Sequence, residues 1–524
     1  MFNMLFKKYL IYFSLLILLI FILLTWNLGK TPFWIDESIT VVPTKNFDGS
    51  LLSPPFDSDS NRFSWQIQNN IYHPEMPLHL HLLVAFFQIF GVSEFSARLP
   101  SVIFGILFLC ITFLMCKNLY NEKMALLTTI FFGTSVFFLI YSQQAIYIIL
   151  ASLMFYLTFY QLLKIFQTSN IKNYIFYFMF LFFSIITHPM GFIIIPISLT
   201  ILLLNQKFSF SKENFYKIFI GLLIFIALYL PIFAFSWKAL PFFNNVSCST
   251  MIHACHKGIF FYPKIILHSL SSNFFEEQIT QSMVFYPSWI IFFVGLFILL
   301  KRLIKKKKDS IFFSSIFFVS FFILSFFEIK NGRYLFFFIS IPLSVCLAYG
   351  TVAISQISKK FSKFILIFLI ILIVFSPINS DGLSTRKLWV YKNVVLPPED
   401  NFEYMKIQSD FINENAYEND IVISTFDNIG LQYYTERKVY GFLNSTHSSD
   451  FFIQLLKNND RVWIVNTLSS ADYCRTRDQE SMSCMEKYYE FIQYYRKNCD
   501  FLVRYDNVSK STDITCEVYL CQQK

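Results

Sequence analysis

Residues 9–28 read YLIYFSLLILLIFILLTWNL, and FWIDESIT (33–40) follows almost at once. An uncharged run of about twenty residues is long enough to cross a bilayer as a helix. It is also longer than a signal-peptide core, and no small-residue cleavage site follows it. The run therefore predicts a retained first membrane span.

Similar runs recur along the whole chain, which is 55% hydrophobic and 15% charged with a mean hydropathy of +0.50. This composition predicts a polytopic α-helical membrane protein. A window of about twenty residues gives about eleven transmembrane helices. They are expected near 9–28, 99–117, 124–141, 144–163, 173–188, 190–205, 215–236, 284–300, 311–328, 334–355 and 363–379.

Lysines gather in alternate connections, of which KRLIKKKK (301–308) is the richest. The positive-inside rule makes these connections cytoplasmic, together with the N-terminus. Outside lie a large first loop, 29–98, and a second loop, 237–283. The net charge of +9 thus reflects topology, which argues against a nucleic-acid partner.

Residues 381–524 differ in composition from the membrane domain of residues 1–380. Short apolar strands such as DIVIST and RVWIVN alternate with helical stretches such as EYMKIQSDFINENAY, as in a small α/β domain. We expect this extracytoplasmic domain to be a lid or an acceptor-recruiting module.

Cysteine positions agree with this topology. Three lie within predicted spans as small apolar residues, and seven lie on the outer side, where disulfides form. The sequence does not reveal their pairing.

Ionisable residues collect on the predicted outer face, where they are costly and usually functional. They are Asp36, Glu37, His73, Glu75, His188 and Arg333. Singly, some have simpler explanations: His188 could cap a helix end, and Arg333 could snorkel. We expect Asp36 and Glu37 to lie on a non-helical loop, and residues 78–90 to form a helix in the membrane interface.

Several of these segments resemble one family in matching order over about residues 10–355. FWIDESITVV resembles the W-x-D-E segment of polytopic glycosyltransferases of the GT-C fold. It resembles in particular the broad bacterial group that is similar to dolichyl-phosphate-mannose protein mannosyltransferases and to the aminoarabinose lipid A transferase (glycosyltransferase family 39-like). Four further blocks resemble that group: YHPEMPLHLHLLVAFFQIFGVSEFSARLPSVIFG, YSQQAIYIILASL, THPMGF and GRYLFFFISIPLSVCLAYG.

This resemblance implies transfer of a sugar from a polyprenyl-phosphate-linked donor to a cell-envelope acceptor at the outer face of the bilayer. It implies Asp36 and Glu37 as catalytic residues, with Asp36 as the base that deprotonates the acceptor, and Arg333 as the group that binds the donor phosphate. Substrate-supporting or metal-binding roles, with a divalent cation as cofactor, fall to Glu37, His73, Glu75 and His188; Gln144 supports substrate.

Two departures separate the chain from the family pattern. Gln144 stands where the family has an acidic residue and Ile146 where it has arginine, while Glu75 and Met76 interrupt the plain H-P-P-L. A catalytically altered member therefore stays open, as does a transporter or flippase of lipid-linked sugars. A transporter is expected to show paired repeats and ionisable groups near the bilayer midplane. Composition and resemblance together favour a bacterial inner membrane.

Overall fold

The computed structural model describes residues 2–30, 32–33, 35–45, 67–68, 71–72, 76–205, 211–236, 287–305, 307–326, 332–357, 361–374, 403–425, 428–435, 437–442, 449–467, 481–505 and 516–522. It divides into two compact units. The first unit contains residues 1–26, 76–79 and 99–396, and the second contains 27–75, 80–98 and 397–524. The predicted boundary near residue 380 falls outside the described residues.

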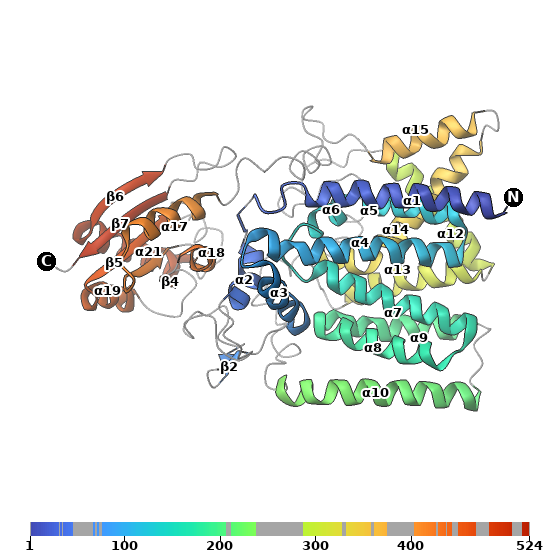
Figure 1. The fold of residues 1–524 in the computed structure, drawn as a ribbon, viewed down its shortest axis with the longest axis horizontal. Coiled ribbons are helices and arrows are strands. Elements are labelled where there is room, and N and C mark those ends of the chain that lie inside the picture. Colours follow the sequence, from blue (N-terminus) through green and yellow to red (C-terminus); the bar gives the residue numbers. More distant parts are fainter. Residues whose placement is uncertain are drawn as a thin grey trace. The chain divides into compact units, whose positions relative to one another are not determined.

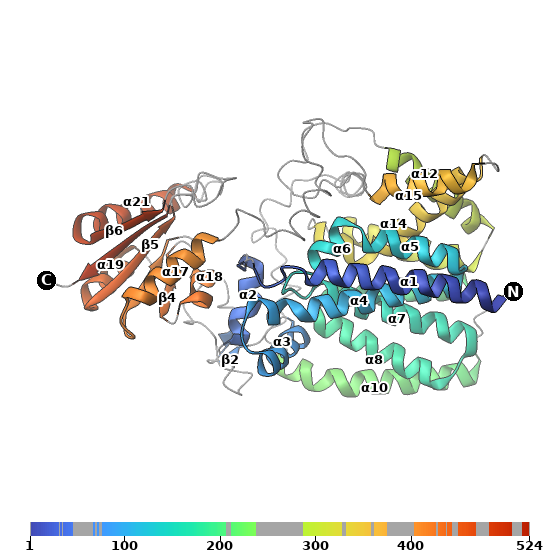
Figure 2. The ribbon, with the colours of Figure 1, turned by 45° about the horizontal axis from the view of Figure 1, so that its top comes forward.

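The first unit is a bundle of apolar helices that lie roughly alongside one another (Figures 1 and 2). Its helices are α1 (Phe2–Thr25), α4 (Glu94–Leu119), α5 (Glu122–Gly133), α6 (Val136–Tyr141), α7 (Ile148–Thr168), α8 (Ile171–Thr187), η1 (Pro189–Ile193), α9 (Ile194–Leu204), α10 (Lys212–Ser236), α12 (Pro287–Ile304), α13 (Lys308–Phe326), α14 (Gly332–Ser355) and α15 (Ser362–Val374). Helix α3 (Pro77–Phe90) begins in this unit and continues into the second, and α4 begins in the second unit.

This bundle confirms a polytopic helical membrane protein. Within the described residues, 4 helices are long and apolar enough to cross a membrane alone, and other apolar helices are shorter, so the number eleven stays a prediction. The segment predicted as one span near 124–141 consists of two helices, α5 and α6. The chain breaks between α5 and α6, where the Ser135 hydroxyl accepts the Phe138 N–H (3.3 Å) and starts a new helix.

Helices α12 and α14 pack backbone against backbone. A Cβ atom built on Gly295 would lie 1.7 Å from the carbonyl oxygen of Cys346, and one built on Gly350 would lie 1.8 Å from that of Ile291. Only glycine allows this approach, and small residues at helix interfaces bring membrane helices into close van der Waals contact. The two glycines therefore fix the spacing of this helix pair.

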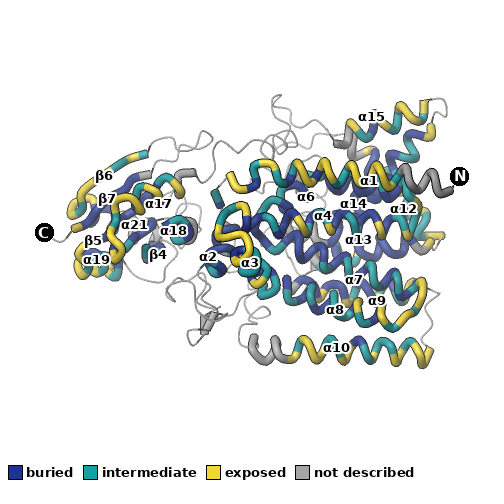
Figure 3. The backbone as a smooth tube through the Cα atoms, in the orientation of Figure 1, coloured by how far each residue is buried: buried dark blue, intermediate teal, exposed yellow. Residues whose placement is uncertain are grey.

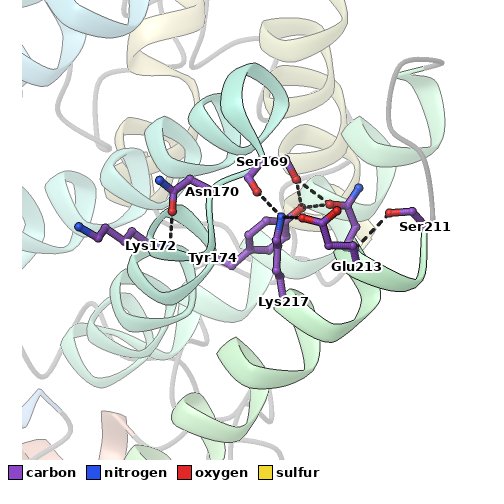
Figure 4. A network of polar contacts seen from close by, with 8 residues as sticks. Ser169, Asn170, Lys172, Tyr174, Ser211, Glu213 and Lys217 are labelled. Carbon is purple, nitrogen blue, oxygen red and sulfur yellow. Dashed lines mark hydrogen bonds and ion pairs between the residues drawn. The ribbon is translucent and has the colours of Figure 1, made fainter.

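Among the four helices of the described residues that are long and apolar enough to cross a membrane, α10 is the most exposed, with 6% of its most apolar window buried against 72% for α7, as Figure 3 shows. A polar network ties its start to the turn between α7 and α8 (Figure 4). Lys217 Nζ donates to the carbonyl oxygen of Ser169 (2.7 Å), and the Ser169 hydroxyl donates to Asn214 Oδ1 (2.6 Å). These two lysine-bearing connections, both predicted to be cytoplasmic, thus lie together.

The second unit contains a five-stranded sheet in the order β4-β3-β5-β7-β6. The strands are β3 (Ile421–Ser424), β4 (Lys438–Gly441), β5 (Arg461–Thr467), β6 (Asp500–Tyr505) and β7 (Cys516–Gln522). Strands β4 and β5 pair with β3 in parallel, whereas β7 pairs antiparallel with both β5 and β6. The unit also holds α2 (Ile35–Lys45) and a two-residue ladder, β1 (Ile67–Gln68) with β2 (Ile71–Tyr72).

Helices cover both faces of this sheet. Side chains of α19 (Ser449–Asn458) and α21 (Ser481–Asn498) pack with Val462 and Ile464 on one face. Side chains of α17 (Glu403–Asn415) and α18 (Asn428–Tyr434) pack with Trp463 and Val465 on the other. The alternation along β5 follows the two-residue period of a strand. The predicted C-terminal α/β domain, with strands at DIVIST and RVWIVN, is confirmed.

Cysteines behave as their positions predict where they are described. Cys499 and Cys521 form a disulfide across 22 positions, joining the end of α21 to β7. Cys110, Cys116 and Cys346 are free thiols within the helical bundle. The disulfide closes a loop in the α/β domain and thereby restricts its unfolded chain.

We expect the double variant Cys499→Ser/Cys521→Ala to lose about 3 kcal/mol of stability in the α/β domain, the value for a loop of this length. Limited proteolysis of the full chain in detergent, followed with temperature, measures this loss. Cys110→Ala, which removes a free thiol, is the matched control and should leave the proteolysis profile unchanged. Equal protease resistance of the double variant and the parent chain would contradict the expectation.

Candidate active site

Asp36 and Glu37 lie in the first turn of a helix. Helix α2 begins at Ile35, so the non-helical loop expected for the two acidic residues is wrong. Carboxylates are favourable in this position because the N-terminus of a helix carries unpaired N–H groups and a partial positive charge. Adjacent positions on a helix are about 100° apart around its axis, so Asp36 and Glu37 occupy different positions around α2.

Glu37 is held by Arg98, near the start of α4. The guanidinium donates from Nε to Glu37 Oε1 (2.8 Å) and from Nη2 to Oε2 (2.7 Å), a two-pronged pair. The two side chains are only 5% and 1% exposed. Buried charges are tolerated when they are paired in this way, and both carboxylate oxygens of Glu37 are engaged.

Arg98 also fixes the segment that leads into α2. Its Nη1 donates to the carbonyl oxygen of Leu28 (3.0 Å), and its Nη2 donates to that of Pro32 (3.0 Å). The guanidinium carbon lies 5.1 Å from the centre of the Phe33 ring. The Arg98 side chain thus contacts the backbone before α2, the ring of Phe33 and the carboxylate of Glu37.

Sequence reasoning missed Arg98, although it lies in the SEFSARLPS block. The available signal was a single arginine near the start of a long apolar helix. Such a charge needs a counter-ion, but several carboxylates precede Arg98 in the first predicted outer loop, among them Glu37, Glu75 and Glu94, and the sequence does not single out Glu37.

A second polar region lies in the first unit, at the irregular turn between α6 and α7. Ser101 donates its hydroxyl to the backbone oxygen of Gln144 (2.6 Å), and Gln143 Nε2 donates to that of Leu24 (3.0 Å). The side-chain oxygen of Gln144 is buried, with no hydrogen-bond partner among the described residues. Gln144 is therefore held through its backbone, and its amide is available for another contact.

His79 of α3 belongs to the same region and was not among the predicted site residues. Both of its ring nitrogens are buried, and neither makes a hydrogen bond of ordinary geometry within the described part of the chain. Burial lowers the pKa of His79 to about 4, an effect that its interaction with the Ala145 backbone offsets only in part. The imidazole is therefore neutral at pH 7.

His188 caps a helix, as its simpler explanation predicts. Its Nδ1 accepts the Met190 N–H (3.2 Å) at the start of η1. The imidazole is buried and stacks on Tyr147, with ring centres 4.8 Å apart and planes inclined by 6°. A substrate role for His188 remains a prediction.

The remaining predicted site residues lie partly or wholly outside the described structure. His73 and Glu75 are not described, and for Asp36 and Arg333 only the helical backbone is described. In the described ranges, no group of three or more His, Cys, Asp or Glu side chains could hold a metal ion. Of the two adjacent acidic residues, the structure therefore describes the side chain of Glu37 alone, together with its partner Arg98.

Comparison with known proteins identifies the fold of the chain. The family model for dolichyl-phosphate-mannose-protein mannosyltransferases matches residues 72–235. ArnT from Cupriavidus metallidurans bound to undecaprenyl phosphate superposes with a TM-score of 0.63 at 10% identity, over 98% of this chain and 98% of that chain. The chain has the GT-C glycosyltransferase fold. No curated protein sequence matches it.

An archaeal oligosaccharyltransferase shares this fold. The apo enzyme from Archaeoglobus fulgidus gives a TM-score of 0.60 at 11% identity, over 96% of this chain and 74% of that chain. AglB of the same organism, with an inhibitory peptide and a dolichol-phosphate, gives 0.56 at 12% identity over the same shares. The oligosaccharyltransferase complex with Zn and sulfate gives 0.54 at 12% identity, over 94% and 72%.

We expect either Glu37→Gln or Arg98→Met to cost about 3–5 kcal/mol, because each leaves one buried charge without its partner. The double variant should lose much less than the sum of the two. Thermal unfolding of the full chain in detergent measures all three. Additive losses in this double-mutant cycle would show that the two side chains stabilise the fold independently.

Proposed function

We propose that this chain is an inverting glycosyltransferase that moves a sugar from a polyprenyl-phosphate-linked donor to a cell-envelope acceptor at the outer membrane face. The observation that carries the proposal is the Arg98–Glu37 pair, which fixes the first turn of the helix that bears Asp36. The GT-C fold and the family match over residues 72–235 support it.

In the proposed reaction, Asp36 accepts the proton of the acceptor hydroxyl while that oxygen attacks the anomeric carbon of the donor sugar. The bond from this carbon to the phosphate oxygen breaks, and the lipid phosphate leaves with the bonding electrons. A single displacement from the opposite side inverts the anomeric centre. Glu37 is unsuited to be the base because Arg98 engages both of its oxygens.

The departing phosphate needs positive charge or hydrogen-bond donors at its oxygens. We assign this role to Arg333, near the start of α14, since a guanidinium matches a phosphate with two parallel hydrogen bonds. Gln144 and His188 are assigned to the sugar or the acceptor. The buried side-chain oxygen of Gln144 supports its assignment, because it offers an acceptor for a sugar hydroxyl.

A divalent cation would supply further positive charge at the phosphate. Of the four ligands predicted for it, Glu37 fits poorly, because its two oxygens accept from Arg98. In His188, Nδ1 accepts a backbone N–H, so only Nε2 could serve as a ligand. The proposed steps above use no metal, and a cation would bind through the side chains of His73, Glu75 and His188.

The proposed location is a bacterial inner membrane, with the N-terminus in the cytoplasm and the α/β domain outside. The Cys499–Cys521 disulfide supports an oxidising compartment for that domain. The lysine-bearing ends of α7 and α10 support a shared cytoplasmic end of the bundle. The envelope acceptor, whether lipid, glycan or protein, is open.

We expect Asp36→Asn to abolish transfer and to retain donor-lipid binding, because the amide is nearly isosteric but cannot accept the proton. Arg333→Lys should instead weaken binding of undecaprenyl phosphate, since the ammonium lacks the two-pronged geometry. Mass spectrometry of envelope lipids and glycans from a deletion strain carrying each variant measures transfer. Titration of the purified variants with undecaprenyl phosphate measures binding.

These two variants control for one another. A strain carrying Asp36→Asn that makes the modified envelope product at the parental level would remove Asp36 as the base. If Arg333→Lys and Arg333→Ala both bound the lipid with parental affinity, Arg333 would not be the phosphate-binding residue, and snorkelling would explain its position.

The topology predicts that a reporter active only outside the cytoplasm is active when fused after Lys524 and inactive when fused after Lys307. Both fusions keep the described helices upstream of the junction intact. Alkaline phosphatase activity of intact cells measures each. The reverse pattern would move Asp36 to the cytoplasmic side and overturn the proposed outer-face reaction.

A further inference from the structure

The last residues of α18, in the C-terminal α/β domain, contact both ends of the helix that carries Asp36. At the beginning, the Tyr434 hydroxyl accepts the backbone N–H of Phe33 (2.8 Å), three positions before Asp36. At the end, Lys45 donates to the carbonyl oxygen of Tyr433, and its Nζ lies 4.9 Å from the centre of the Tyr433 ring. Neighbouring residues of the α/β domain therefore hold α2 at its two ends.

Aromatic packing seals the first of these contacts. The Phe33 side chain is 0% exposed, with its ring edge-to-face on Tyr433 at 4.8 Å and near Tyr434 at 6.4 Å. The other neighbour of the Phe33 ring is the Arg98 guanidinium. Phe33 thus contacts both Arg98, which is paired with Glu37, and Tyr433 of the α/β domain.

Tyr434 is itself anchored in the α/β domain. Asn413 of α17 donates its side-chain N–H to the backbone oxygen of Tyr434 (2.9 Å). Leu431, one turn earlier on α18, is 1% exposed and belongs to the sheet core formed with Val422 and Trp463. A displacement of Tyr434 would therefore require repacking of that core.

Tyr434 remains a neutral phenol at physiological pH. Burial raises the pKa of its hydroxyl, the nearby Glu94 raises it further, and the Phe33 N–H and Arg98 lower it only in part. A neutral hydroxyl can accept the Phe33 N–H and still carry a proton, so this contact persists across the pH range in which cells live.

We propose that the C-terminal α/β domain positions the catalytic helix, and that Tyr434 is the positioning residue through which it does so. The catalytic part of this statement rests on the proposed role of Asp36. A lid that opens in each cycle would have to break the Tyr434–Phe33 and Tyr433–Lys45 contacts and expose Phe33 to water. The domain is therefore a fixed support for α2.

Tyr434→Phe tests the proposal, because it removes one hydroxyl and leaves the aromatic packing in place. Hydrogen exchange of the full-length protein in detergent should show faster exchange at Phe33 and across the first turn of α2. A hydrogen bond of ordinary strength predicts roughly a threefold to tenfold increase. Peptides from β3 and β5 should exchange as in the parent chain. Tyr489→Phe, at an exposed position of α21, is the matched control.

Transfer is measured separately, by mass spectrometry of envelope lipids and glycans in a deletion strain. The proposal predicts a lower product level for Tyr434→Phe, parental affinity for undecaprenyl phosphate, and no change in either readout for Tyr489→Phe. Unchanged exchange in α2 overturns the positioning role. Faster exchange with parental product overturns its importance for catalysis. If the parental chain itself yields no envelope product, the proposed function fails, while the exchange result still decides the contact.

Discussion

The buried ion pair between Arg98 and Glu37 is the interaction on which the organisation of the site depends. Two charges with 5% and 1% exposure are stable only with the geometry that the structure provides, in which each carboxylate oxygen has its own N–H donor. Because Arg98 also binds two backbone carbonyls before α2, its loss would release the whole entry to that helix. The pair thus helps to fix where α2 begins.

The α/β domain adds a second constraint, which comes from the sheet. Parallel pairing of β3 with β4 requires a connection that crosses back over one face of the sheet, and α18 is that connection. Its last two residues, Tyr433 and Tyr434, contact Phe33 and Lys45. A domain without recognisable catalytic motifs therefore holds the α2 segment through its topology.

The spacing and length of apolar segments predict most of the fold. Most membrane helices, and the tail strands at Ile421–Ser424 and Arg461–Thr467, lie near their predicted positions. Hydropathy did not predict three features. The break between α5 and α6 lies inside an apolar run, and α2 begins in a segment with little periodicity. The Arg98–Glu37 pair joins residues 61 positions apart. Hydropathy reports burial in lipid, but it does not report which buried charges meet.

Of the two adjacent carboxylates, Glu37 has a definite structural partner. Its negative charge is compensated by the Arg98 guanidinium within the fold. The α6–α7 turn lacks charged side chains at two positions, because Gln144 and Ile146 stand where the resembled family has an acidic residue and an arginine. Ile146 is buried at 2% exposure, and Gln144 keeps its backbone contact with Ser101. Because neither Gln144 nor Ile146 carries a charge, the turn holds no unpaired buried ion at these two positions.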